Sequence, residues 1–159
     1  MYSVKIIAVG KLKEDWQKTA AAKYEKRLSG YCKLETVEIK ECRLSDAPSE
    51  REIEAALIAE GRAILEETKG VPFTALCIEG KKTTSEGLSE KIRSAASAGR
   101  SKLVFVIGSS FGLSKEVKTA ASARLSMSDM TFPHMLARVM LLEQIYRAFS
   151  ILNNGKYHK

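Results

Sequence analysis

The chain has few of the residues that build disulfide-rich or metal-binding proteins. It contains three cysteines, Cys32, Cys42 and Cys77, and only two histidines, His134 and His158. The cysteines form no CxxC pair, and their odd number disfavours a disulfide framework. Four zinc ligands at a familiar spacing are also missing. We therefore expect no bound metal and a reducing compartment, the cytoplasm.

Long apolar runs, glycine and proline are scarce as well. No segment approaches the ~20 apolar residues of a membrane span, and the run at 4–9 is short and interrupted by Lys5, unlike a signal-peptide core. Ten glycines, three prolines and 45% hydrophobic residues exclude collagen-like and disordered chains. What is left is a chain of 159 residues, the size of one domain, with no membrane partner.

Positive charge is abundant. Lysine and arginine number 26 against 19 acidic residues, which gives a net charge of +7. A surplus of this size in a small domain indicates a polyanionic partner, with nucleic acid as the first candidate. A basic domain without such a partner is the alternative.

Hydrophobic periodicity predicts strands and helices in alternation. The predicted strands are 4–9, 34–39, 73–78, 102–107 and 123–127, and the helices are 11–28, 50–69, 88–98, 115–121 and 133–153. Ser49 with Glu52 forms a capping box, Ser114 caps a short helix, and Pro133 suits a first helical position. Residues 79–87 are predicted to be a polar loop. This order predicts one α/β domain over 1–159, with a mostly parallel sheet and helices on both faces.

In such sheets, ligands bind at the carboxyl ends of the strands. The loops after Ile78, Ile107 and Met127 are therefore candidate binding segments. Gly108 and Gly112 allow close backbone approach to a ligand, but they form neither GxGxxG nor a Walker A loop, so a plain turn is the alternative. Residues 125–134 mix apolar and small polar residues, which suits a half-apolar pocket or an edge strand leading into a helix.

The last predicted helix is apolar around most of its circumference. One broad side carries Met135, Val139, Leu142, Ile145, Tyr146, Phe149 and Leu152, whereas Leu136, Met140 and Ile151 fall elsewhere. A small domain has few elements to cover so much apolar surface, so the pattern predicts a homodimer interface. A central core helix is the alternative.

Three features combine charge with unusual neighbours. Arg138 and His134 lie on a side of the last helix that also carries apolar residues, where a polar or charged group needs a partner. Each of them is therefore a candidate to contact a ligand. The alternative is an internal ion pair for Arg138 and a helix cap for His134. The ending Lys156-Tyr157-His158-Lys159 suits phosphate contact and base stacking. A frayed terminus is the alternative for these four residues.

Taken together, these segments resemble the ribosomal RNA large subunit methyltransferase H family of the SPOUT (α/β-knot) superfamily, over essentially the whole chain. The resemblance is carried by Val4-Lys-Ile-Ile-Ala-Val-Gly-Lys11, Tyr24 to Leu28, Ile107-Gly-Ser-Ser-Phe-Gly-Leu113, Leu125 to His134, Glu143 to Phe149, and Tyr157-His-Lys159. The family usually has a second glycine where this chain has Ser109. That residue would be strained if the position required a positive φ, and we expect the loop to tolerate it.

The resemblance implies an enzyme that transfers a methyl group from S-adenosylmethionine to N3 of a pseudouridine in 23S rRNA, on assembled ribosomes. It also implies a C-terminal trefoil knot and a homodimer. By position, the implied cofactor-binding residues are Leu76, Gly108, Met127, Ser128, Asp129, Met130, Thr131 and Phe132. Arg138, Tyr157 and His158 are expected to be catalytic, and Lys156, Tyr157, His158 and Lys159 to bind RNA. A methyltransferase acting on another RNA such as tRNA, or a non-catalytic RNA-binding module of the ribosome, are the alternatives.

Overall fold

The computed structural model describes residues 1–159 and contains one five-stranded sheet. The strands are β1 (Tyr2–Val9), β2 (Cys32–Ile39), β3 (Thr74–Lys82), β4 (Lys102–Ile107) and β5 (Ala123–Ser126). Their order across the sheet is β2-β1-β4-β3-β5, and every neighbouring pair is parallel. The predicted parallel α/β sheet is confirmed.

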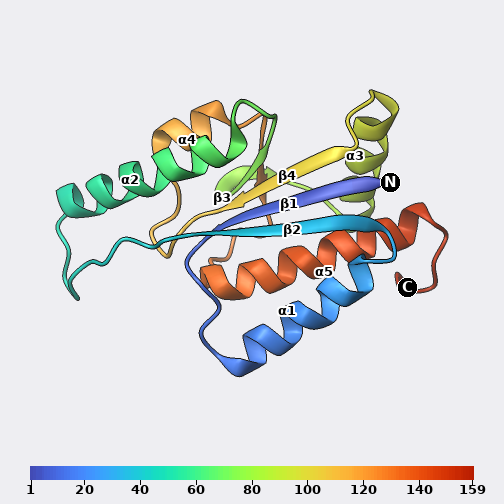
Figure 1. Cartoon of the computed structure of the whole chain (residues 1–159), viewed down its shortest axis with the longest axis horizontal. Helices are drawn as coiled ribbons and strands as arrows, with labels where there is room; N and C mark the ends of the chain where they lie inside the picture. Colours follow the sequence, from blue (N-terminus) through green and yellow to red (C-terminus); the bar gives the residue numbers. More distant parts are fainter.

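Helices cover both faces of this sheet, as Figure 1 shows. They are α1 (Asp15–Leu28), α2 (Glu50–Thr68), α3 (Ser85–Ser97), α4 (Lys115–Ala120) and α5 (His134–Leu152). One core lies between the sheet and α1, α3 and α5. The second lies between the sheet and α2 and α4. β1 and β4 contribute to both cores, because their successive side chains point to opposite faces.

Two helix caps fold as the sequence predicts. The Ser49 side chain accepts a hydrogen bond from the backbone N–H of Glu52, and the Glu52 side chain closes the box at the start of α2. The Ser114 side chain accepts from the backbone N–H of Val117 at the start of α4. Helix α1 begins at Asp15 rather than at 11, because Gly10 turns the chain at φ 89° and a second box forms at Glu14 and Gln17.

The prediction of a polar loop over 79–87 is wrong. Strand β3 continues to Lys82, and α3 begins at Ser85. After a bulge that follows Leu76, Lys81 and Lys82 pair again with β5. Gly80 permits this, because a Cβ there would lie 2.8 Å from backbone atoms of β5. The polar side chains of this stretch mislead the sequence pattern, since most of them are exposed although the backbone pairs with β5.

Helix α5 is largely covered within its own chain. Leu141, Leu142, Ile145, Ala148 and Phe149 are almost fully buried, in the core that α1 and α3 share with the sheet. This side of α5 packs as the core helix offered as the alternative would, and the prediction of a homodimer interface stays a prediction. Leu136, Met140 and Ile151 stay only partly buried. Pro133 lies one residue before the helix instead of at its first position.

None of the five helices combines the length and the apolar character that a membrane span requires. The three cysteines are free thiols. No group of three or more His, Cys, Asp or Glu side chains gathers as metal ligands would.

Candidate functional site

A pocket lies at the carboxyl ends of β3, β4 and β5. This loop pocket has a volume of about 280 Å³. Its walls come from the three segments chosen by the strand-end rule, namely 76–79, 107–113 and 125–132 without Asp129, together with Lys118, His134 and Ala137. Of the eight predicted cofactor-binding residues, all but Asp129 line it. Chain segments far apart in sequence thus meet where the sequence predicts a ligand.

The loop after β4 needs glycine at its first position. A Cβ on Gly108 would lie 2.2 Å from the carbonyl oxygen of Gly112, so the two backbones could not approach as they do. Ser109 pairs with Gly112 in a short antiparallel bridge, and Gly112 takes the positive φ of 89°. Ser109 itself has no positive φ, so the expectation that the loop tolerates it is confirmed.

The pocket carries an apolar rim and an ion pair. Ile78, Phe111 and Met130 line it and are 49%, 47% and 74% exposed. Exposed apolar side chains gathered at a pocket are typical of a binding site. The Lys118 ammonium lies 2.5 Å from the Glu79 carboxylate, and this hydrogen bond is the main cause that lowers the Glu79 pKa. The Glu79 carboxylate is therefore ionised at neutral pH.

Asp129 lies outside the pocket lining. Its carboxylate accepts a hydrogen bond from the Lys82 ammonium at 2.7 Å, and both side chains are largely exposed. The contact joins the segment after β5 to the end of β3. Ser128 shapes the same segment, because its Oγ accepts a hydrogen bond from the backbone N–H of Met130.

His134 is the first residue of α5 and lines the loop pocket. Its Nε2 is buried without a hydrogen-bond partner and lies 3.8 Å from Oε1 of Glu41. Burial lowers the His134 pKa, and the Glu41 carboxylate only partly opposes this shift. The imidazole is therefore neutral at neutral pH. It does not serve as the helix cap offered as its alternative, because no cap hydrogen bond is formed there.

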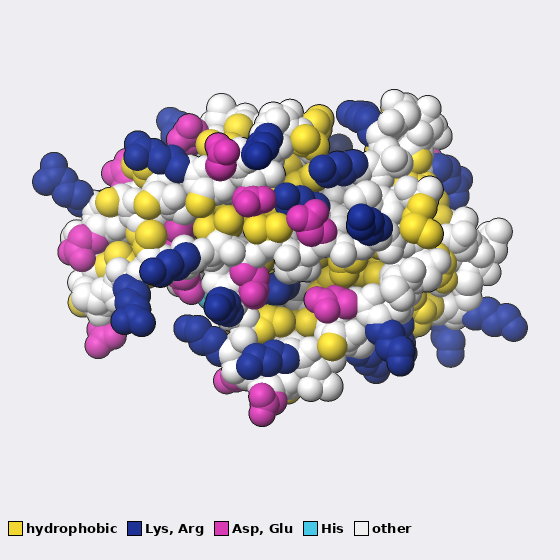
Figure 2. Space-filling model, in the orientation of Figure 1, with side chains coloured by type: hydrophobic (Ala, Val, Ile, Leu, Met, Phe, Trp, Pro, Cys, Tyr) yellow, Lys and Arg dark blue, Asp and Glu magenta, His cyan; other side chains and the backbone are white.

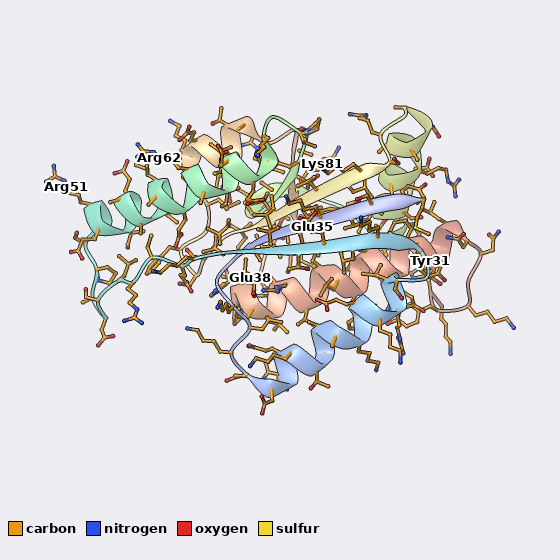
Figure 3. All side chains as sticks on the ribbon, in the orientation of Figure 1. Tyr31, Glu35, Glu38, Arg51, Arg62 and Lys81 are labelled. Atoms are coloured by element: carbon orange, nitrogen blue, oxygen red, sulfur yellow. The ribbon has the colours of Figure 1, made fainter.

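Arg138 forms the internal ion pair offered as its alternative. Its Nη1 donates to Oε2 of Glu38 at 2.8 Å, from α5 to the end of β2, where Figure 3 labels Glu38. The Arg138 side chain is 7% exposed, and its Nε is buried with no acceptor in the chain. Arg138 does not line the loop pocket.

The C-terminal tail is docked on the protein. The Tyr157 hydroxyl donates to Oε1 of Glu143, and its ring meets Tyr146 edge-on with the Arg147 guanidinium over its face. Nε2 of His158 lies 2.7 Å from Glu86. Burial is the main cause that raises the Tyr157 pKa to about 12. The alternative of a frayed terminus is wrong for Tyr157 and His158, whereas Lys156 and Lys159 remain exposed.

Within one chain, the tail and the loop pocket lie apart. The tail contacts α3 and α5 near the end of the molecule where β1 starts, and no tail residue lines the pocket (Figure 1). Sequence reasoning also missed Glu79, Lys118, Glu38 and Glu41. Glu79 follows directly on a predicted strand end and could have been found, whereas the pairing of the other three depends on the tertiary fold.

The whole chain matches known methyltransferases. A family model described as "Predicted SPOUT methyltransferase" matches residues 2–158. The chain belongs to the SPOUT methyltransferase family. Ribosomal RNA large subunit methyltransferase H 1 of Clostridium perfringens (strain SM101 / Type A) is 46% identical over 158 residues, which covers 99% of each chain. Ribosomal RNA large subunit methyltransferase H of Clostridium botulinum (strain Hall / ATCC 3502 / NCTC 13319 / Type A) is 47% identical over the same length and coverage. The family named from sequence motifs is confirmed.

Solved structures of a probable methylase and of a tRNA methyltransferase share the fold. A probable methylase family protein from Haemophilus influenzae Rd KW20 superposes with a TM-score of 0.57 at 15% identity, covering 98% of this chain and 70% of that one. The tRNA (m1G37) methyltransferase of Aquifex aeolicus gives 0.55 at 12% identity, covering 91% of this chain and 69% of that one. At such low identity, these likenesses establish the fold alone.

Proposed function

We propose that this SPOUT family member methylates N3 of a pseudouridine in 23S rRNA of the large ribosomal subunit, with S-adenosylmethionine as methyl donor. The supporting observation is the loop pocket, where seven residues expected from the family resemblance meet at the strand ends. Relatives at 46–47% identity along the whole chain are named as large-subunit rRNA methyltransferases. The net charge of +7 supports an RNA substrate.

The loop pocket fits such a donor. Gly108 leaves a backbone-lined wall where no side chain could stand, and backbone N–H and C=O groups suit the polar edge of a purine. Leu76, Met127 and Phe132 supply apolar surface. Lys118 and Glu79 carry the two charges complementary to the carboxylate and ammonium of an amino acid. These residues would hold S-adenosylmethionine, which supplies an electrophilic methyl group when bound.

Methyl transfer is an in-line displacement, so the protein's main task is to position the target base and manage its proton. We assign Arg138 to the uracil oxygens, since its buried Nε hydrogen has no acceptor in the chain. The raised pKa of Tyr157 keeps its phenol protonated, so it holds or stacks on the base. The imidazole of His158 then accepts the N3 proton. Lys156 and Lys159 contact RNA phosphates.

This assignment requires a homodimer, because each tail lies away from its own loop pocket. We propose that the tail of one protomer completes the pocket of its partner, across an interface that includes Leu136, Met140 and Ile151. We also propose that residues 1–159 form a single domain with a C-terminal trefoil knot. Ribosomes in the cytoplasm are the proposed site of action.

Purified protein tests the proposal in two steps. Calorimetry with S-adenosylmethionine should show saturable binding, and absence of binding would favour a non-catalytic RNA-binding module. Transfer of a labelled methyl group should then occur to intact ribosomes and not to free tRNA. Labelling of tRNA alone would assign the enzyme to another RNA.

A further inference from the structure

A second cavity adjoins the loop pocket and shares one wall with it. This basic groove has a volume of about 740 Å³ and is lined by Gly10, Lys11, Lys13, residues 38–45, Ile53, Ala56, Leu57 and Glu60. The shared wall consists of Ser109, Ser110 and Phe111, which line both cavities. A chain lying in the basic groove could thus direct a side group over this wall into the loop pocket.

Four exposed cations line the basic groove, namely Lys11, Lys13, Lys40 and Arg43. None of them forms an ion pair within the chain, although nine other pairs occur. Figure 2 shows Lys and Arg side chains on both sides of a notch between the segment after β2 and the segment before α1. Unneutralised cations on facing walls attract a polyanion.

The acidic residues of the groove offset this charge only in part. The carboxylate of Glu38 is engaged by Arg138 at 2.8 Å. Glu60 is 4% exposed and accepts a hydrogen bond from the backbone N–H of Cys42 at 2.9 Å, while burial raises its pKa. Glu41 faces His134. The open surface of the groove is therefore dominated by its four cations.

The shared wall also offers an aromatic face. The Phe111 side chain is 47% exposed, although burial of such a ring is favourable. Bases of single-stranded RNA stack on exposed aromatic rings beside positively charged grooves. The cations of the basic groove, the Phe111 ring and the loop pocket thus follow one another in space.

We propose that the basic groove binds the phosphate backbone of single-stranded RNA next to the nucleotide to be methylated, and that Phe111 stacks on a base at the entrance to the loop pocket. This inference rests on the proposed function and names the surface that delivers the RNA to it. It assigns to Lys11, Lys13, Lys40 and Arg43 a substrate-docking role separate from the C-terminal tail.

The test compares two variants that each lose four exposed cations. The groove variant carries Lys11→Gln, Lys13→Gln, Lys40→Gln and Arg43→Gln. The control variant carries Lys23→Gln, Lys26→Gln, Lys33→Gln and Lys102→Gln, at positions that are exposed, unpaired and outside the groove. Binding of a short fluorescent oligouridylate is measured by anisotropy over a range of salt concentrations. The KM for purified ribosomes is measured with labelled S-adenosylmethionine.

We expect the groove variant to lose at least tenfold in RNA affinity relative to the control. Its plot of log affinity against log salt should be shallower by about 3, since each single-strand phosphate contact contributes ~0.7. Its KM for ribosomes should rise, while its affinity for S-adenosylmethionine stays within about twofold of the wild type. Equal affinities and slopes for the two variants would overturn the inference, and so would a wild type that binds no RNA. Failure of the wild type to methylate ribosomes would instead refute the proposed function, because the binding assay is read separately.

Discussion

The guanidinium of Arg138 lies 2.8 Å from the carboxylate of Glu38 and ties the first turns of α5 to the end of β2. The Arg138 side chain is 7% exposed and that of Glu38 is 34% exposed, so the pair is only partly screened by water. Arg138→Ala should therefore lower the free energy of unfolding by about 2–3 kcal/mol, below the value for a fully buried pair. Chemical denaturation measures this, and a double-mutant cycle with Glu38→Ala isolates the pair.

Variants of the same two residues distinguish a structural role of Arg138 from a catalytic one. Arg138→Lys keeps the charge but loses the planar fork, so we expect kcat to fall roughly a hundredfold if the guanidinium stabilises charge on the uracil. Glu38→Ala leaves the guanidinium in place and should retain most of kcat. Equal losses in the two variants would show that Arg138 acts only by holding the fold.

Deletion of Lys156–Lys159 should abolish methylation of ribosomes while leaving affinity for S-adenosylmethionine within about twofold, since no tail residue lines the loop pocket. The melting temperature serves as the control, because the deletion also removes the contacts of Tyr157 with Glu143 and of His158 with Glu86. Tyr157→Phe keeps the ring and should melt close to the wild type. Unchanged turnover of the truncated protein would contradict the assigned role of the tail.

Mixing variants tests whether the tail acts across a dimer. The truncated protein and the Arg138→Lys protein should each be nearly inactive. Mixed dimers formed by co-refolding should regain part of the activity, because one composite site then has both an intact Arg138 and an intact partner tail. A mixture no more active than its components would place the tail and Arg138 in the same protomer's site or in none.

The loop after β4 allows a matched pair of substitutions at neighbouring positions. Gly108→Ala should lower affinity for S-adenosylmethionine at least tenfold, since its Cβ would lie 2.2 Å from the carbonyl oxygen of Gly112 and the loop must shift. Ser109→Gly should leave that affinity within about threefold, because Ser109 is not at a positive φ. Calorimetry measures both, and comparable binding by Gly108→Ala and the wild type would place the cofactor elsewhere.

His134 gives the stability of the protein a specific pH dependence. Its folded-state pKa is lowered by burial, so the unfolded chain binds a proton more readily below the ordinary value of 6.5. Stability should therefore fall as the pH drops through 6.5, and His134→Gln should reduce this loss. Glu41→Gln should enlarge it, because the carboxylate partly supports the charged imidazole. Identical pH profiles for all three proteins, measured by thermal unfolding, would contradict the buried neutral state.

The sequence predicted most of the fold but not its long-range pairings. Strand 102–107 and the Ser49 capping box follow from local patterns, and both occur as expected. The extension of β3 past Ile78 was missed, because its pairing with β5 depends on a distant backbone fitting against Gly80. The homodimer interpretation of α5 stays a prediction: α1 and α3 cover much of this helix, whereas Leu136, Met140 and Ile151 are only partly buried.

The site was predicted in a similar way. The strand-end rule and the family motifs together predicted the position of the loop pocket, because both specify which backbone segments surround it. Ion pairs such as Arg138 with Glu38, or Lys118 with Glu79, join residues that only the folded chain brings together. The docking of the tail on α5 depends on Glu143 and Tyr146, and no sequence pattern connects these two residues with Tyr157.

The most direct test of the central claim is mass mapping of 23S rRNA from cells with and without the gene. We predict that one pseudouridine-containing fragment from normal cells is heavier by a single methyl group, and that this methyl is lost on deletion and restored by the wild-type gene but not by the tail-truncated gene. An unchanged 23S rRNA, or a methyl group lost from tRNA instead, would contradict the account.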